Sequence, residues 1–340
     1  MMYPPFWRVL TESVNVTARG GSTRSTQRDA AVTLWQDASA MLRSFTASEF
    51  PAERLVDTKR GRTVSVVLPA RNEAPTVGPI VEAIRTELIE RHHVVDELVV
   101  IDDGSTDATA QRAAAAGAAV VAAAGVLPEY GDEGGKGQAM WRGLHVTNGD
   151  LVAFCDADIT GFSVDFILGL VGPLLARDDI GFVKGFYRRA YRGQAGEGGR
   201  VTELMARPLI SLLFPELAPL VQPLAGECAA RREILETVPF AGGYGVDLAL
   251  LIDIANRFGV SAFAQCDLGE RVHRNRPLAD LGPQATAILQ LALDRAGVAG
   301  AAGAGDPWDA VLVRPGVDPY RLTLVERPPL ADVPAHRKTA

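Results

Sequence analysis

Short apolar runs alternate with amphipathic stretches between residues 63 and 155. The apolar runs are rich in β-branched residues and predict four strands: "TVSVVLPA" (63–70), "DELVVIDD" (96–103), "AVVAA" (119–123) and "LVAFC" (151–155). Between them, apolar positions at helical spacing predict helices over 76–90, 106–118 and about 136–147. Strands that alternate with helices form a parallel sheet covered on both faces, so we expect an α/β fold.

Polar clusters follow three of these strands at the point where each strand ends. "PARNE" (69–73) follows the first strand, "DDGSTD" (102–107) the second and "DADIT" (156–160) the fourth. In an open α/β sheet, ligands bind beyond the carboxyl ends of the strands. We therefore expect the three clusters to converge on one edge of one sheet.

The regions outside this alternation of strands and helices have weaker patterns of apolar and polar residues. The sequence predicts a polar extension over 12–27, a helix from about Thr26 to Phe45, a strand over 181–191, and helices over 201–214, 230–237, 246–258 and 282–295. The segment 296–307 is of low complexity, with glycine and alanine predominating.

Composition narrows the class of protein. The chain of 340 residues is 47% hydrophobic and 22% charged, as in soluble globular proteins, and its net charge of -7 argues against a general nucleic-acid binder. Cys155, Cys228 and Cys266 lack metal-ligand spacing and are expected to be reduced thiols. No apolar run approaches the roughly 20 residues that span a bilayer. The N-terminus lacks the pattern of a secretory signal, so we expect a cytoplasmic protein without membrane contact.

Asp156 and Asp158 are two residues apart at the end of a predicted buried strand. In an extended segment they would point the same way, and such close like charges need a neutralising partner. A divalent cation can supply it and leave open positions for a diphosphate. The alternative is a turn in which the carboxylates only accept backbone hydrogen bonds. The two other polar clusters at the same edge favour the metal.

Several motifs together resemble a known family. "VSVVLPARNEAPTVG", "ELVVIDDGSTD", "GGKGQAMWRGL" and "GDLVAFCDAD" are similar to the successive signatures of GT-A-fold glycosyltransferases. The later stretches "GRVTELMARPL", "PLAGE", "GGYGVDLALLIDI" and "RVHRNRPL" resemble actinobacterial glucosyl-3-phosphoglycerate synthases and the related mannosyl-3-phosphoglycerate synthases. The resemblance covers about Ser48 to Asp280.

This resemblance implies a GT-A fold, with a Rossmann-like, mostly parallel sheet, helices on both faces and a C-terminal acceptor-binding region. It divides the chain into an N-terminal extension and helix (1–47), a nucleotide-sugar-binding half (48–180), an acceptor-binding half (181–295) and a C-terminal tail (296–340). It also implies a homodimer, with 282–295 as a candidate contact whose apolar positions could equally belong to the core.

The same resemblance assigns site residues. The donor-binding positions it implies are Pro69, Ala70, Glu73, Asp103, Ser105, Lys136 and Asp156. Glu73 and Ser105 are also suited to helix-capping and turn roles. The metal, Mg²⁺ or Mn²⁺, is assigned to Asp158 and His273. The acceptor positions are Arg200, Thr202 and Asn275, whose side chains suit phosphate and carboxylate oxygens.

The reaction that the resemblance implies is a hexosyl transfer by a metal-dependent retaining glycosyltransferase. Glucose would pass from a nucleotide diphosphate glucose, with UDP-glucose favoured, to the 2-hydroxyl of 3-phosphoglycerate. Asp156 and Asp247 are the catalytic candidates. Many family members have Glu where this chain has Asp247. We therefore expect Asp247 to position the substrates while the donor phosphate accepts the acceptor proton, and a double displacement is the other possibility.

Three alternatives remain at this point. The same fold could use GDP-mannose and form mannosyl-3-phosphoglycerate. A sugar nucleotidylyltransferase would carry a G-x-G-T-R loop after the first strand, and "PARNEAPT" does not match it. A non-catalytic sugar-nucleotide sensor would have little use for an arginine-lined acceptor pocket.

Overall fold

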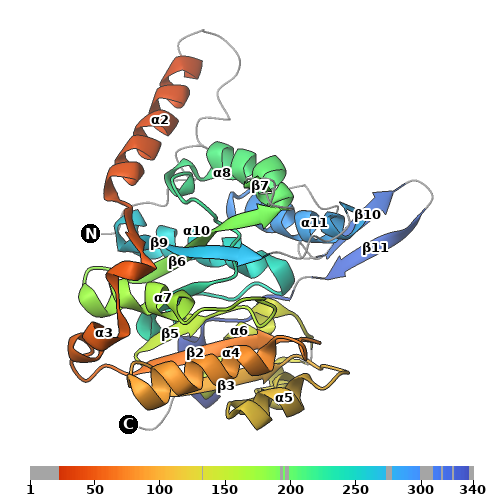
Figure 1. Cartoon of the computed structure of the whole chain (residues 1–340). Helices are drawn as coiled ribbons and strands as arrows, with labels where there is room; N and C mark the ends of the chain where they lie inside the picture. Colours follow the sequence, from red (N-terminus) through yellow and green to blue (C-terminus); the bar gives the residue numbers. More distant parts are fainter. Residues whose placement is uncertain are drawn as a thin grey trace.

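The computed structural model describes residues 23–131, 133–191, 194–195, 199–272, 278–298, 309–314, 317–323 and 325–336. At its centre is a mixed sheet with the strand order β1-β9-β6-β8-β5-β2-β3-β4, in which β7 also pairs with β6 (Figure 1). These strands are β1 (Arg43–Thr46), β2 (Val64–Ala70), β3 (Glu97–Asp102), β4 (Ala119–Ala122), β5 (Leu151–Phe154), β6 (Phe182–Tyr191), β7 (Gln194–Ala195), β8 (Cys228–Arg231) and β9 (Phe263–Val272). The predicted strands β5, β2, β3 and β4 pair in parallel, which confirms the α/β fold.

Helices cover both faces of the sheet. Side chains alternate along each strand, so that Val66 and Leu68 of β2 enter one hydrophobic core while Val67 enters the other. The helices packed on the first core are α3 (Ala52–Thr58), α4 (Val77–Ala83), which continues as a π-helical turn (Ile84–Arg91), α5 (Thr109–Ala116) and α7 (Asp165–Ala176). Those on the second are α6 (Lys136–Val146), α8 (Arg207–Leu213), α9 (Arg232–Leu235), α10 (Val246–Phe258) and α11 (Leu278–Arg295).

The second half of the chain extends the same sheet. β8 lies between β5 and β6 and runs antiparallel to both, whereas β6 pairs in parallel with β9, and β9 with β1. The predicted helix over 230–237 is therefore wrong for 230–231, which end β8, but it is confirmed for α9 at 232–235. The strand over 263–272 was not foreseen. The sequence "CAAR" at 228–231 is rich in alanine, which alone favours a helix. Pairing with strands on both sides overrides that preference.

The N-terminal helix is shorter than the sequence predicts at its C-terminal end. Helix α2 (Thr23–Met41) stops before β1, which pairs with β9 at the edge of the sheet, so Phe45 is in a strand.

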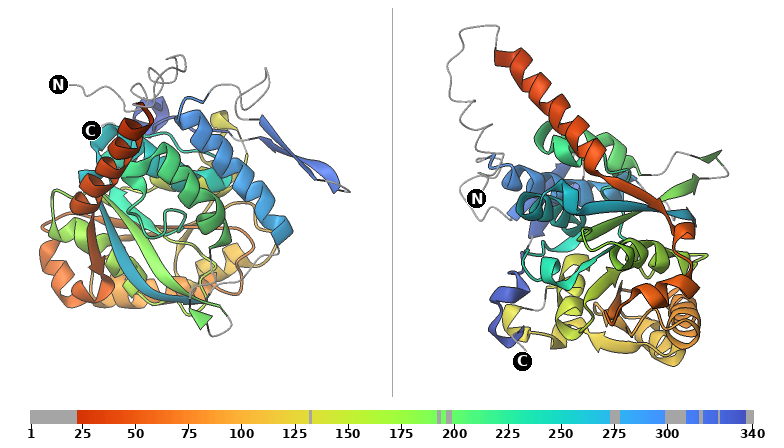
Figure 2. Two further views of the ribbon diagram at one scale, coloured as in Figure 1. Left: turned by 90° about the horizontal axis from the view of Figure 1, so that it is seen from above. Right: turned by 90° about the vertical axis from the view of Figure 1, so that its left-hand side faces the viewer.

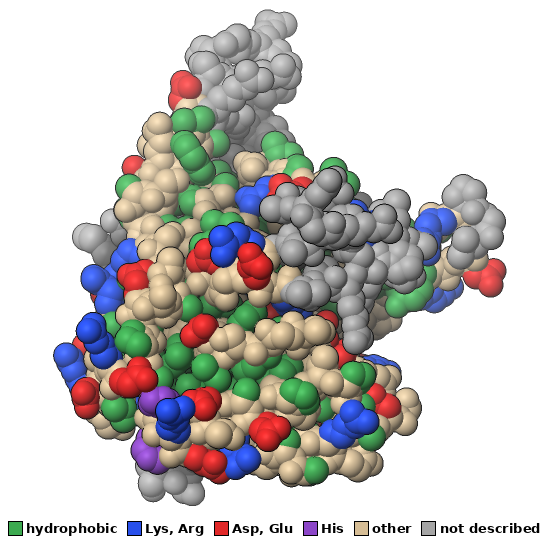
Figure 3. Space-filling model, viewed as in Figure 1, with side chains coloured by type: hydrophobic (Ala, Val, Ile, Leu, Met, Phe, Trp, Pro, Cys, Tyr) green, Lys and Arg blue, Asp and Glu red, His purple; other side chains and the backbone are tan. Residues whose placement is uncertain are grey.

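Both α2 and a hairpin of β10 (Asp309–Arg314) and β11 (Val317–Thr323) extend away from the body of the molecule (Figure 2). Hydrophobic side chains are visible on α2 in the space-filling view (Figure 3). No helix in the described part of the chain is long and apolar enough to cross a membrane.

Residues 325–336, which we call the C-terminal segment, pack against α6. The indole N–H of Trp141 donates to the carbonyl of Pro328 at 2.8 Å, and the Gln138 amide donates to the carbonyl of Val325 at 2.8 Å. Leu330 and Val333 are fully buried in the second core. The segment therefore fixes the helix that begins at Lys136. The extension predicted over 12–27 and the stretch 296–307 lie mostly outside the described residues.

We predict that Leu330→Ala lowers the free energy of unfolding by about 2–5 kcal/mol, because it opens a cavity in the second core. Urea unfolding measures the change. The control is Leu212→Ala on α8, where the side chain is 77% exposed. It should change stability by less than about 0.5 kcal/mol. Equal effects of the two substitutions would show that the C-terminal segment does not contribute to the core.

Candidate active site

The three polar clusters meet at the carboxyl edge of the parallel strands, as the sequence predicts. The backbone N–H of Asn72, after β2, donates to Ser105 Oγ, after β3, at 3.0 Å. Thr76 Oγ1, three residues beyond the first cluster, donates to the carbonyl of Ala157, after β5, at 2.7 Å. These bonds fix the loops relative to one another. The predicted donor residues Pro69, Ala70, Glu73 and Ser105 thus lie at one edge of the sheet.

Asp103 joins this edge to the loop before α6. Its Oδ2 accepts the backbone N–H of Gly135 at 2.7 Å, and Arg71 lies 3.6 Å from the same oxygen. Burial raises the pKa of Asp103, although the bond from Gly135 and the charge of Arg71 oppose the rise. Gly135 has a φ of 114°, which favours glycine, and it places Lys136 at the first position of α6.

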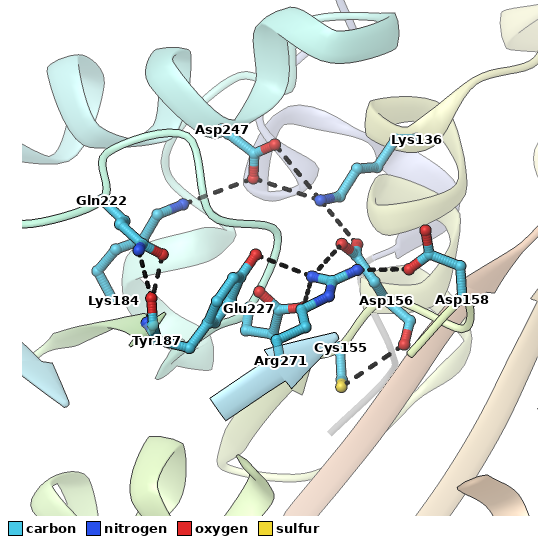
Figure 4. A network of polar contacts seen from close by, with 10 residues as sticks. All are labelled: Lys136, Cys155, Asp156, Asp158, Lys184, Tyr187, Gln222, Glu227, Asp247 and Arg271. Carbon is cyan, nitrogen blue, oxygen red and sulfur yellow. Dashed lines mark hydrogen bonds and ion pairs between the residues drawn. The ribbon is translucent and has the colours of Figure 1, made fainter. Parts of the chain in front are cut away.

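The carboxylates of Asp156 and Asp158 are part of a larger set of paired charges (Figure 4). We call this set the ion-pair network. Its members are Lys136, Asp156, Asp158, Lys184, Glu227, Asp247 and Arg271. They come from α6, the loop after β5, β6, the residue before β8, α10 and β9. The second half of the chain thus supplies most of the partners of the predicted Asp-x-Asp motif.

Lys136 connects the two predicted catalytic carboxylates. Its Nζ is 2.9 Å from Asp156 Oδ1 and 3.3 Å from Asp247 Oδ2, while Lys184 Nζ is 3.5 Å from Asp247 Oδ1. Burial alone would raise the pKa of Asp156, but the charges of Lys136 and Arg271 outweigh it and hold that pKa well below its usual range. Asp156 is therefore held ionised between two cations, and Asp247 is paired with two lysines.

Arg271 occupies the centre of the network. Its Nη2 is 2.5 Å from Asp158 Oδ1, and its Nη1 donates to Glu227 Oε1 at 2.6 Å and lies 3.3 Å from Asp156 Oδ2. Nη1 also donates to the Tyr187 hydroxyl at 2.9 Å, and the guanidinium lies over the Tyr187 ring. The sequence prediction that the two aspartates need a neutralising cation is thus met, in part, by an arginine.

Glu227 is the most deeply buried acid of the network. It is fully buried, and its Oε2 has no hydrogen-bond partner among the described residues. Burial raises the pKa of Glu227 to about 7, even though the neighbouring Arg271 charge acts in the opposite direction. The preceding residue, Gly226, has no room for a side chain, because a Cβ there would lie 2.2 Å from Asp156 Oδ2. The glycine of "PLAGE" lets this strand approach Asp156.

The carboxylate oxygens of the ion-pair network suit a divalent cation. Carboxylate oxygens are the ligands that Mg²⁺ and Mn²⁺ prefer, and the Asp158 side chain is the most exposed in the network, at 38%. The described residues contain no group of three or more His, Cys, Asp or Glu side chains arranged around a metal position. His273, the second predicted ligand, lies outside the described residues. The pair of Asp158 and His273 stays a prediction.

The predicted acceptor residues are only partly described. Arg200 lies two residues before the start of a π-helical turn (Thr202–Ala206), in which Thr202 is buried. Asn275 lies outside the described residues. The acceptor assignment therefore stays a prediction.

The sequence analysis assigned no role to Lys184, Glu227 or Tyr187, and Arg271 appeared there only within the motif "RVHRNRPL". Two signals could have been used. Lys184 is a single charge within the apolar run "GFVKGFY", and Glu227 ends the quoted motif "PLAGE". A charged residue inside a buried run needs a partner, and here the partners are Asp247 in α10 and Arg271 in β9, far away in the sequence.

Comparison with known proteins places the chain among glycosyltransferases. Residues 65–238 match the family described as Glycosyl transferase family 2. The glucosyl-3-phosphoglycerate synthase of Mycolicibacterium smegmatis is 50% identical over 244 residues, covering 71% of this chain and 80% of that protein. The synthase of Petrotoga mobilis is 40% identical over 315 residues, covering 87% and 95%.

Solved structures agree with this relationship. Glucosyl-3-phosphoglycerate synthase from Mycobacterium tuberculosis, in complex with Mn²⁺, UDP-glucose and phosphoglyceric acid, has a TM-score of 0.76 and 43% identity, covering 85% of this chain and 98% of that one. Mannosyl-3-phosphoglycerate synthase from Rubrobacter xylanophilus has a TM-score of 0.79 and 40% identity, covering 89% and 99%.

The raised pKa of Glu227 predicts a pH-dependent effect of Glu227→Gln. A carboxyl that binds its proton more tightly in the folded chain loses stabilisation as the pH rises from its unfolded pKa towards about 7. Between pH 5 and pH 8, the stability of Glu227→Gln relative to the wild type should therefore rise by about 1–3 kcal/mol. Urea unfolding at both pH values measures it. Glu203→Gln, at an exposed ion pair with Arg207, is the control. A Glu227→Gln difference that is equal at both pH values would contradict the assignment.

Proposed function

The chain belongs to glycosyl transferase family 2, among the glucosyl-3-phosphoglycerate synthases, and on this basis we propose that it transfers glucose from UDP-glucose to 3-phosphoglycerate. The product is glucosyl-3-phosphoglycerate. One observation carries the proposal. This chain is 43% identical to the M. tuberculosis enzyme that was solved with UDP-glucose, Mn²⁺ and phosphoglyceric acid, and its own Asp-x-Asp motif lies beside Lys136 at the carboxyl edge of the sheet.

The donor lies along that edge. The residues proposed to bind it are Pro69, Ala70, Glu73, Asp103, Ser105, Lys136 and Asp156. The backbone at the end of β2 and the carboxylates beside it suit the base and the ribose hydroxyls. Lys136 is the cation at the N-terminus of α6, where a diphosphate also meets the positive end of the helix dipole.

Asp158 and His273 hold the divalent cation, Mg²⁺ or Mn²⁺. When bound, the cation neutralises negative charge that develops on the leaving diphosphate. Solved complexes of the M. tuberculosis enzyme with substrate or product contain Mn²⁺ together with a uridine nucleotide. The exposure of the Asp158 carboxylate is consistent with this role.

The acceptor phosphate and carboxylate are bound by Arg200, Thr202 and Asn275. The acceptor 2-hydroxyl attacks with retention of configuration. Both oxygens of Asp247 are engaged by lysines, which supports a positioning role rather than attack on the sugar. In the same-face mechanism that we favour, the donor phosphate takes the proton of the acceptor hydroxyl, and Asp156 and Asp247 orient the sugar and the hydroxyl.

A second donor is supported by a specific likeness. The solved mannosyl-3-phosphoglycerate synthase of R. xylanophilus matches this chain at a TM-score of 0.79. A panel of UDP-glucose, GDP-glucose and GDP-mannose, each with 3-phosphoglycerate and Mg²⁺, decides between the two. Product from UDP-glucose alone supports the glucosyl assignment, and product from GDP-mannose alone supports the mannosyl assignment. The absence of any product would favour a non-catalytic sensor of sugar nucleotides.

The proposed assembly is a homodimer. In the predicted contact 282–295, Ile288 and Leu291 are fully buried in the core, which leaves Leu289 as the exposed apolar residue at 39%. Exposed apolar side chains on the hairpin, Val313 and Tyr320, offer further contact area. Light scattering that gives a monomer mass at micromolar concentration would contradict this assembly.

The proposed location is the cytoplasm, because both substrates carry phosphate charges that keep them inside the cell.

The metal assignment predicts that Asp158→Ala abolishes glucose transfer, because it removes a charged ligand. Folding should remain intact, since the side chain is partly exposed. Transfer is measured by release of UDP, and folding by circular dichroism. Excess EDTA should abolish transfer by the wild type, and added Mg²⁺ or Mn²⁺ should restore it. Full activity in EDTA would refute the metal assignment.

The acceptor assignment predicts a selective effect of Arg200→Ala. A charge-assisted hydrogen bond contributes roughly 1.5–3 kcal/mol, so the KM for 3-phosphoglycerate should rise about ten- to a hundredfold. The KM for UDP-glucose should barely change, because other residues bind the donor. Glycerate, which lacks the phosphate, should be a poor acceptor for the wild type and no worse for the variant. If both acceptors weakened equally, Arg200 would not be the residue that binds the phosphate.

A further inference from the structure

The guanidinium of Arg271 has two unequal edges. Nη1 is directed at Glu227, the Tyr187 hydroxyl and Asp156, whereas Nη2 is directed at Asp158 (Figure 4). Glu227 and Tyr187 are buried, and the Arg271 side chain itself is only 4% exposed. Asp158 is the partner nearest to solvent. The contact with Asp158 is therefore the one that can be exchanged without disturbing the others.

An oxygen of Asp158 that accepts a guanidinium hydrogen bond is poorly available to a divalent cation. The bond from Nη2 directs positive charge at Oδ1 from 2.5 Å. Like charges repel strongly at short range, and more so where water is partly excluded. A metal ion that binds Asp158 must therefore either move this carboxylate away from Arg271 or accept a close positive neighbour.

We propose that Arg271 is a positioning residue that competes with the divalent cation for Asp158 and so weakens metal binding to the protein. This inference rests on the proposed role of Asp158 as a metal ligand. Glu227 and Tyr187 are what keep Arg271 in place, because they hold the buried edge of the guanidinium while its other edge faces the exchangeable carboxylate. The metal affinity of the site is then set by strand β9 as well as by the Asp-x-Asp motif.

The decisive variant is the double substitution Glu227→Gln and Arg271→Met. Removing Arg271 alone would leave Glu227 buried without its cation, which is strongly destabilising. The double variant avoids this and leaves the formal charge of the network unchanged, at one net negative charge, because one acid and one base are removed together. An altered metal affinity then reports the lost competition rather than a change in net charge.

We expect the double variant to bind Mn²⁺ at least about tenfold more tightly than the wild type. The measurement is a titration of the protein with Mn²⁺ alone at pH 8, in which electron paramagnetic resonance follows the free ion. At equal Mn²⁺, the rise in melting temperature should also be larger for the variant, since ligand-linked stabilisation follows affinity. The control is Arg207→Met, which breaks an exposed pair with Glu203 by the same chemical change. It should bind Mn²⁺ as the wild type does.

Arg271→Lys keeps the inference testable if the double variant does not fold. Lysine retains the charge beside Glu227, but a single ammonium cannot span Glu227 and Asp158 as the planar guanidinium does. We expect a several-fold gain in Mn²⁺ affinity. If the folded variants bind Mn²⁺ no more tightly than the wild type, or if no form binds it, the competition is refuted.

Glucose transfer by the wild type is assayed separately. Its failure would refute the proposed function, whereas unchanged affinities with intact transfer would refute only the competition.

Discussion

The pairing of Arg271 with Glu227 is the interaction on which the arrangement of the site depends. Glu227 is fully buried, and burying a carboxylate without a cation would cost several kcal/mol. Arg271 supplies that cation and, with the other edge of the same group, also reaches Asp156 and Asp158. A single guanidinium thus links a residue that precedes β8 to the acidic loop after β5. Gly226 allows this close approach by leaving the Asp156 carboxylate in place.

The sheet topology explains why both halves of the chain are needed to assemble the charged side chains of the site. Parallel strands β2, β3 and β5 bring three polar loops to one edge, and these loops contribute mainly acids, amides and hydroxyls. Lys136 comes from the start of α6, while Lys184 and Arg271 come from neighbouring strands, β6 and β9, of the later part of the chain. The C-terminal segment then fixes α6 through Gln138 and Trp141. The charged residues of the network therefore come from one continuous sheet, its loops and the helices packed on it.

Local pattern was sufficient for the first half of the fold and insufficient for the second. The β-branched runs of β2 and β3 are sufficient to predict strands. Because the carboxyl ends of parallel strands lie at one edge of a sheet, the sequence also predicted that Asp103, Asp156 and Asp158 share that edge. The strand "CAAR" carries no such local signal, because its conformation comes from its neighbours β5 and β6. For the same reason the sequence could suggest a cation beside Asp158 but could not show that Arg271 lies there, since that contact joins residues 113 positions apart.

The distance along the chain between Glu227 and Arg271 also has a consequence for protein synthesis. The ribosome makes Glu227 first, and Arg271 follows on the order of seconds later, at ordinary elongation rates. During that interval β8 cannot pair with its neighbours β5 and β6 without burying an acid that has no cation beside it. The parallel strands β2 to β5 need no residue of β9 for their pairing, whereas Glu227 gains its cation only once β9 has been made. The acidic edge of the nascent chain therefore stays open to water until β9 has been translated.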